Sequence, residues 1–188
     1  MIAAMIDLET MGRSARAPIV SIGAVKFDMD LSCPLPVPTL EDDHQFYRVV
    51  SLRSSVEAGL EMDPETVMWW LDQTKDAQNS LLPAGTGAIV DLPRALYLLK
   101  LWWETPPKPV TMWSHATFDA VILHEAYRLC AMDPPWHYRE VRDLRTAQAE
   151  VDCTQYAYDY RNHHHALYDA WRQANLLKWV RKQVRERG

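Results

Sequence analysis

One stretch of sequence decides the fold, namely Met1-Ile2-Ala3-Ala4-Met5-Ile6-Asp7-Leu8-Glu9-Thr10. It is apolar up to Ile6, which is typical of a strand buried on both faces of a sheet. Asp7 and Glu9 lie two positions apart, so their side chains share one face of such a strand. Burying unpaired acids costs roughly several kcal/mol per charge. We therefore expect the pair to lie at the strand's solvated end, to contact a cation, or both.

Outward from this strand, the sequence predicts further β-branched strands at 19–27 and 45–50. The first three strands could form an antiparallel meander, with a proline-rich loop at 32–43. Asp63 and Pro64 are a good helix start, and that helix runs through Leu71. A glycine-bearing loop at 82–90 follows. Further helices are predicted at 92–103, 118–132, 144–151 and 166–185, and short strands at 109–113 and 138–143. This order indicates an α/β fold, a mixed sheet with helices on both faces.

Length and composition predict a single domain over residues 1–188. Apolar residues make up 48% of the chain, enough to bury a core, and no apolar run is long enough to cross a bilayer. The apolar start lacks a basic flank and contains an acid, so it is read as a strand rather than a signal peptide. Cys33, Cys130 and Cys153 are widely spaced and odd in number, which favours reduced thiols and a cytoplasmic location.

The formal net charge of −5 argues against broad electrostatic capture of a polyanion. That objection weakens if several acids form one metal site, because two divalent ions would bring the net charge to about −1. The only dense basic stretch, 181–187, is interpreted as a solvated helix end, where cations suit the helix dipole. The charge pattern therefore predicts a substrate held locally rather than along a basic track.

A third acid, Asp119, stands at the start of a predicted helix, directly after a predicted strand. With Ser114 and Thr117 nearby, it could simply favour the helix N-terminus. However, the carboxyl end of a strand is also where open α/β sheets place their ligands. Both interpretations stay open for Asp119 taken alone.

A fourth acid, Asp169, follows His164 by five positions. On one continuous helix the two would not share a face well, but they could meet if His164 lies in the loop before the helix. An imidazole with a pKa near 6.5 suits a general base acting on water. We interpret His163 and His165 as surface residues. Four convergent acids would repel one another without cations, and carboxylate-bound metal pairs are a common means of cutting phosphodiesters.

Trp69 and Trp70 are adjacent, so they point to different sides of a helix. We expect one of them to lie in the core. The other could stack on a nucleobase, a sequence-tolerant contact worth about 1–3 kcal/mol, although packing explains either tryptophan as well.

These pieces together resemble the DEDD superfamily of 3′→5′ exonucleases, in its catalytic-histidine (DEDDh) subgroup. The resemblance spans nearly the whole chain, and its motifs occur in the expected order. They are Asp7-Leu8-Glu9-Thr10, His115-Ala116-Thr117-Phe118-Asp119 and His164-x-Ala166-x-x-Asp169-Ala170. Two further stretches, 63–71 and 142–146, look like a phage and bacterial branch related to exodeoxyribonuclease VIII-type and mycobacterial exoribonuclease-like proteins. The second motif departs from the pattern, since asparagine often stands where this chain has His115.

The resemblance implies an RNase H-like mixed five-stranded sheet. It further implies that the four acids Asp7, Glu9, Asp119 and Asp169 hold two Mg²⁺ or Mn²⁺ ions, with Asp7 bridging both. Hard oxygen ligands suit these ions. His164 would be the general base, and the product would be a nucleoside 5′-monophosphate. The implied substrate-binding residues are Thr10, Met11, Trp69, Trp70 and Phe118, with Met11 as an apolar wedge against a base.

The substrate implied by the resemblance is the 3′ end of single-stranded DNA or RNA. The phage-like motifs favour DNA slightly, and a homodimer is possible because the family often forms dimers. Two alternatives stay open. An RNase H-like endonuclease also uses clustered acids and two metals, and a non-catalytic module could use the acids as a structural metal site.

Overall fold

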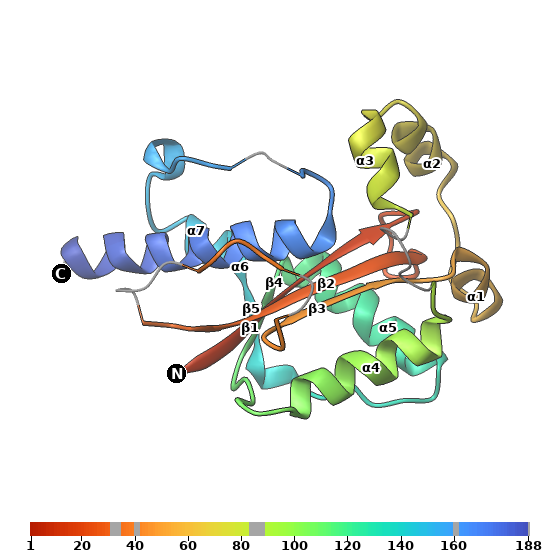
Figure 1. Cartoon of the computed structure of the whole chain (residues 1–188), viewed down its shortest axis with the longest axis horizontal. Coiled ribbons are helices and arrows are strands. Elements are labelled where there is room, and N and C mark those ends of the chain that lie inside the picture. Colours follow the sequence, from red (N-terminus) through yellow and green to blue (C-terminus); the bar gives the residue numbers. More distant parts are fainter. Residues whose placement is uncertain (31–34, 40–41, 83–88, 160–161, 188) are drawn as a thin grey trace.

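The computed structural model describes residues 1–30, 35–39, 42–82, 89–159 and 162–187. It contains one mixed five-stranded sheet in the order β3-β2-β1-β4-β5, with helices on both faces (Figure 1). The strands are β1 (Ile2–Thr10), β2 (Ile19–Asp28), β3 (Gln45–Val49), β4 (Met112–Ser114) and β5 (Val141–Asp143). β1, β2 and β3 pair antiparallel, whereas β4 pairs parallel to both β1 and β5. The predicted α/β fold, an RNase H-like mixed sheet, is confirmed.

The helices are α1 (Leu52–Glu57), α2 (Pro64–Leu71), α3 (Lys75–Ser80), α4 (Leu92–Glu104), α5 (Val121–Leu129), α6 (Leu144–Gln148) and α7 (Ala166–Arg187). A single π-helical turn, η1 (Ala116–Ala120), precedes α5, and short 3-10 turns lie at η2 (Tyr138–Glu140) and η3 (Cys153–Gln155). Among the described residues, none of these helices has the length and apolar composition needed to span a bilayer.

Alternation along β1 decides which side chains face which helix. Ala4, Ile6 and Leu8 pack in a core with α4 and α5. Ala3 and Met5 point the other way, into a core shared with the first half of α7. Because side chains two apart share a face, Asp7 and Glu9 continue the row of Ala3 and Met5. Both acids therefore lie on the side of the sheet that α7 covers.

Gly23 lets α7 approach the sheet closely. It stands opposite Asp7 in the β1–β2 register, and a Cβ at this position would lie only 2.1 Å from the backbone carbonyl carbon of Ala166. A glycine inside a strand often marks such a close backbone approach. The first turn of α7 is thereby seated directly over the end of β1 that carries the acids.

Several predicted boundaries are corrected by the structure. The helix predicted at 118–132 begins instead with η1 at Ala116 and ends at Leu129. The strand predicted at 138–143 splits, because Tyr138–Glu140 forms a 3-10 turn held by a reciprocal cap between His137 and Glu140. The predicted loops at 32–43 and 82–90 fall partly outside the described residues, as does Cys33. Cys130 and Cys153 are both free thiols, as expected.

Candidate active site

The four predicted acids converge at one end of the sheet. Asp7 and Glu9 come from the last part of β1, Asp119 from η1 beyond β4, and Asp169 from the first turn of α7. All four side chains are buried, with exposed fractions of 8%, 7%, 1% and 9%. More than 160 positions separate the first acid, Asp7, from the last, Asp169, so only the fold brings them together.

The ligand atoms form two groups that share Asp7. One oxygen each from Asp7, Glu9 and Asp169 lie within 4.8 Å of one another. Asp7 and Asp119 form a second group at the same spacing, together with a ring nitrogen of His115. The donor set consists mainly of hard carboxylate oxygens, which suits Mg²⁺ or Mn²⁺. A pair of cations that share one bridging carboxylate would therefore fit the residues present.

Burial raises the pKa of three of these carboxyl groups, those of Asp7, Glu9 and Asp119, because the charged form loses solvation. The pKa of Asp119 is raised to about 7, although backbone hydrogen bonds favour its charged form. The pKa values of Asp7 and Glu9 also lie well above their ordinary range, through burial and then repulsion from the neighbouring acids. A cation at this position would offset the cost of ionising the cluster.

Two adjacent residues of α7 contact the acids and were not singled out by the sequence analysis. Gln173 donates a 2.6 Å hydrogen bond from its side-chain amide to Oδ1 of Asp7. Arg172, only 2% exposed, forms an ion pair with Asp169 one turn earlier on the same helix. Since α7 places residues three and four apart on one side, the helix carries both an acid and its supporting partners.

Asp119 is held by the turn in which it lies. The backbone N–H of His115 donates a 2.9 Å hydrogen bond to Oδ2 of Asp119. The neighbouring N–H of Ala116 donates to Asp143 at 3.0 Å, which ties η1 to β5. Single π-helical turns within helices are frequent at functional sites. Asp119 therefore accepts a backbone hydrogen bond within a π-helical turn and does more than favour a helix N-terminus.

His164 lies in the turn before α7, with φ of 64°, a left-handed backbone conformation that is uncommon for residues other than glycine. Its carbonyl oxygen accepts a hydrogen bond from the hydroxyl of Ser80 in α3, a helix the sequence analysis did not predict. The imidazole packs edge-on against Trp69 and Trp70, with ring centroids 5.1 and 5.7 Å apart. Burial, followed by the neighbouring His163, lowers the pKa of His164. His164 is therefore half-buried, its imidazole packs against the two tryptophans, and burial favours its neutral form.

His165, interpreted from sequence as a surface residue, is instead half-buried. Its ring stacks on Tyr47 of β3 with centroids 4.3 Å apart. The hydroxyl of Tyr47 donates to the carbonyl of Ser80 at 3.1 Å. The segment before α7 thus contacts both β3 and α3, which hold it in position. His163 is exposed, as expected.

A cavity of about 490 Å³ opens beside the acids, and it contains four of the five predicted substrate-binding residues. It is lined by Leu8, Glu9, Thr10, Gly12, Arg13, Glu65, Thr66, Trp69, Trp70 and Phe118. Met11 is the exception, because its side chain is buried with Val20, Trp70 and Ala77. Trp70 is core, at 4% exposed, whereas Trp69 is 44% exposed. One tryptophan thus lies in the core and the other is partly exposed, as the sequence analysis expected.

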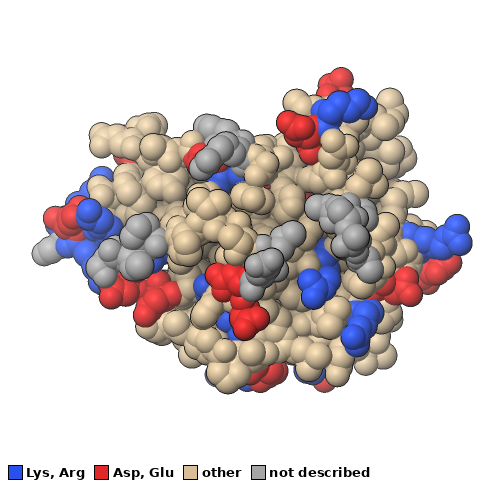
Figure 2. Space-filling view, in the orientation of Figure 1, with Lys and Arg blue, Asp and Glu red and all other residues tan. Residues whose placement is uncertain are grey.

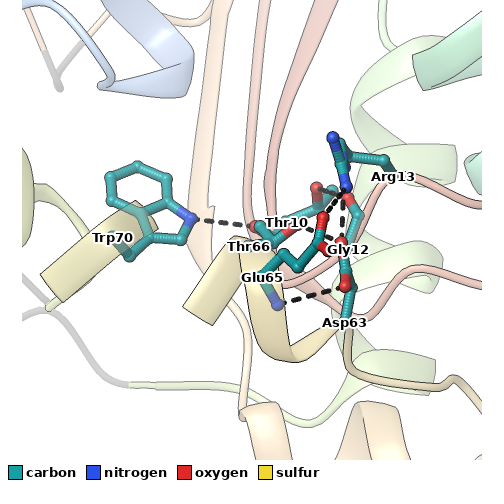
Figure 3. A network of polar contacts seen from close by, with 7 residues as sticks. All are labelled: Thr10, Gly12, Arg13, Asp63, Glu65, Thr66 and Trp70. Atoms are coloured by element: carbon teal, nitrogen blue, oxygen red, sulfur yellow. Dashed lines mark hydrogen bonds and ion pairs between the residues drawn. The ribbon is translucent and has the colours of Figure 1, made fainter. Parts of the chain in front are cut away.

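Polar contacts fasten α2 to the end of β1 (Figure 3). The indole N–H of Trp70 donates to the carbonyl of Thr10 at 3.0 Å. Arg13 forms ion pairs with Asp63, the N-cap of α2, and with Glu65 in its first turn. Because β1 also carries the first two acids, these contacts set the cavity wall at a fixed position relative to the acid cluster.

Comparison with models of known families shows to which family the chain belongs. The model of the 3′-5′ exoribonuclease Rv2179c-like domain matches residues 3–180. The chain belongs to this family. It is accordingly a 3′→5′ exonuclease, an enzyme that acts on nucleic acid, and the convergent acids make divalent-metal use plausible. No protein in a curated collection matches this exonuclease significantly.

Proposed function

We propose that this exonuclease removes nucleotides one at a time from the 3′ end of single-stranded RNA and releases nucleoside 5′-monophosphates. The observation that carries the proposal is the pair of ligand groups that share Asp7. Two divalent ions held there would lower the pKa of a bound water and stabilise charge on the leaving oxygen. The family description names RNA, so we propose RNA rather than the DNA that the motifs slightly favoured.

The chain's own residues would then have distinct roles. Asp7, Glu9, Asp119 and Asp169 hold the ions, and His164 accepts the proton of the attacking water, as in the DEDDh subgroup. A lowered pKa supports this role, because the imidazole is neutral and able to accept a proton. Trp69 and Phe118 would stack on or wedge against the terminal bases, and Thr10 would line their site.

Substrate capture would be local. On the face shown in Figure 2, basic and acidic side chains are interspersed among broad neutral areas and form no continuous basic track. Together with the net charge of −5, this supports binding through the metal site and base stacking. Binding should therefore fall only modestly as salt concentration rises.

The proposal is tested with matched RNA and DNA oligonucleotides in three forms: linear and 3′-blocked molecules labelled at the 5′ end, and internally labelled circles. Each form is incubated with Mg²⁺ or Mn²⁺ and with EDTA. We expect stepwise shortening of linear RNA, no cutting of circles, and no activity in EDTA. Cutting of circular substrates would instead favour an RNase H-like endonuclease. Metal binding without any cleavage would favour a structural metal site.

Two variants separate the proposed roles. Asp7→Asn should abolish cleavage and leave the fold intact, because it removes the carboxylate that both ligand groups share. His164→Ala should reduce turnover by about 10²–10⁴-fold, the usual contribution of a general base, and leave metal affinity mostly in place. A collapse of metal affinity in His164→Ala would make His164 a ligand rather than a base.

A further inference from the structure

The imidazole of His115 has no role in the contacts described so far. The residue lies between β4 and η1 and is half-buried. Its backbone N–H binds Asp119, and its carbonyl accepts hydrogen bonds from the N–H groups of Phe118 and Asp119. Its ring, in contrast, makes no hydrogen bond, ion pair or ring contact with any residue in the described part of the chain. The local structure therefore uses the backbone of His115 and leaves the ring available.

The ring is nevertheless placed among the acids. One of its nitrogens lies within 4.8 Å of oxygens from Asp7 and Asp119, which lie equally close to each other. The other ligand group, Asp7 with Glu9 and Asp169, contains only carboxylates. The two halves of the cluster thus differ in donor chemistry, since one offers oxygens alone and the other offers oxygens with one imidazole nitrogen.

The other nearby histidines are engaged differently. The His164 ring packs against Trp69 and Trp70, and the His165 ring stacks on Tyr47. Neither belongs to a group of possible ligand atoms among the described residues. His115 is therefore the histidine whose ring the fold directs at the carboxylates that the proposed function requires.

We propose that His115 is a nitrogen ligand of the ion held by Asp7 and Asp119, and that it makes this half of the site select Mn²⁺ over Mg²⁺. Mg²⁺ prefers an octahedral shell of oxygens, whereas first-row transition ions bind imidazole more strongly. The inference rests on the proposed function, because it assumes that the four acids hold divalent ions. It adds which ion the site prefers and which residue causes the preference.

The test is calorimetric titration of the metal-free protein with Mn²⁺ and, separately, with Mg²⁺. It compares wild type, His115→Asn and His124→Asn; His124 is an exposed histidine of α5 and serves as the matched control. We expect His115→Asn to lose about tenfold or more in Mn²⁺ affinity while Mg²⁺ affinity changes by less than about threefold. His124→Asn should match wild type. Melting curves in EDTA check that both variants fold.

A spectroscopic measurement separates ligation from a structural effect. Pulsed electron paramagnetic resonance of the Mn²⁺-loaded protein should show coupling to a histidine nitrogen in wild type and His124→Asn, and none in His115→Asn. Nitrogen coupling that persists in His115→Asn would overturn the inference, as would equal losses of Mn²⁺ and Mg²⁺ affinity. If wild type binds neither ion, both this inference and the proposed two-ion function are contradicted.

Discussion

The side-chain amide of Gln173 donates a 2.6 Å hydrogen bond to Asp7, the acid that belongs to both ligand groups. Gln173 is only 5% exposed, and its carbonyl oxygen has no hydrogen-bond partner in the described part of the chain. The contact therefore orients the shared carboxylate from α7, across 166 positions of sequence. If Asp7 holds the proposed ions, Gln173 is a positioning residue, because it acts through Asp7.

Gln173→Leu should weaken metal binding by about 10–100-fold, as is typical when the partner of a metal ligand is removed. The variant should keep its melting temperature in EDTA, because leucine fills a similar volume and also removes an unpaired buried carbonyl oxygen. Calorimetric titration with Mn²⁺ measures the first effect, and thermal unfolding measures the second. An unchanged Mn²⁺ affinity would contradict the positioning role.

The stability of the metal-free protein should depend on pH through Asp119. Its pKa rises from 3.8 to about 7 on folding, chiefly because the carboxyl group is buried. The folded state therefore holds a proton that the unfolded state releases, and stability falls as pH rises from about 4 to about 7. Asp119→Asn removes this titration, so the variant should gain stability over wild type as pH rises through that window.

Denaturant unfolding in EDTA at pH 5, 6, 7 and 8 measures this difference between wild type and Asp119→Asn. Histidine titration is common to both proteins and cancels in the comparison. Added Mn²⁺ should stabilise wild type more at pH 8 than at pH 5, because metal binding must displace the proton. A difference that does not change with pH would show that Asp119 ionises normally.

Gly23→Ala should impair activity more than its small size suggests. The added methyl group would lie 2.1 Å from the Ala166 carbonyl carbon, so the first turn of α7 must move away from β2. That movement displaces Asp169 and His164 relative to Asp7. We expect loss of both metal affinity and turnover, measured by calorimetry and by RNA cleavage. Wild-type values for both would show that α7 can shift without disturbing the acids.

Trp69→Ala and Trp70→Ala should affect different properties, the first substrate binding and the second the stability of the fold. Trp69 is 44% exposed and lines the cavity, so its loss should raise KM for RNA by about 5- to 150-fold, equivalent to the roughly 1–3 kcal/mol of one stacked base. Trp70 is buried and bonds Thr10, so its loss should cost about 3–5 kcal/mol of stability.

Steady-state kinetics and denaturant unfolding on both variants test the contrast between the two tryptophans. An unchanged KM in a stable Trp69→Ala protein would remove the stacking role. A Trp70→Ala protein as stable as wild type would show that Trp70 does not anchor α2.

Strand periodicity in the sequence was enough to place Asp7 and Glu9 on one face of β1, and a helix-start signal at Asp63 and Pro64 correctly placed α2. The supporting residues could not be found in this way. Gln173 and Arg172 read as ordinary polar helix positions, and only the packing of α7 on the sheet turns them inward. Gly23 offered a weak signal, a single glycine inside a β-branched strand.

The helix α3 was missed because Lys75–Ser80 has no apolar periodicity of its own. Its stability comes from a side-chain cap by Thr74 and from the packing of Ala77 against Met11 and Trp70. The half-buried position of His165 was also missed, because its stacking partner, Tyr47, lies more than a hundred residues earlier in the sequence. Contacts of this kind are properties of the tertiary fold and leave no local pattern.

The position of the acids along the chain has a consequence for protein synthesis. β1 is synthesised before α7, the helix that carries Asp169, Arg172 and Gln173. A nascent chain that still lacks α7 has neither the final carboxylate nor the partner of Asp7. If these residues act as proposed, the nascent polypeptide stays unable to degrade RNA, including the message being translated, until α7 has emerged and docked.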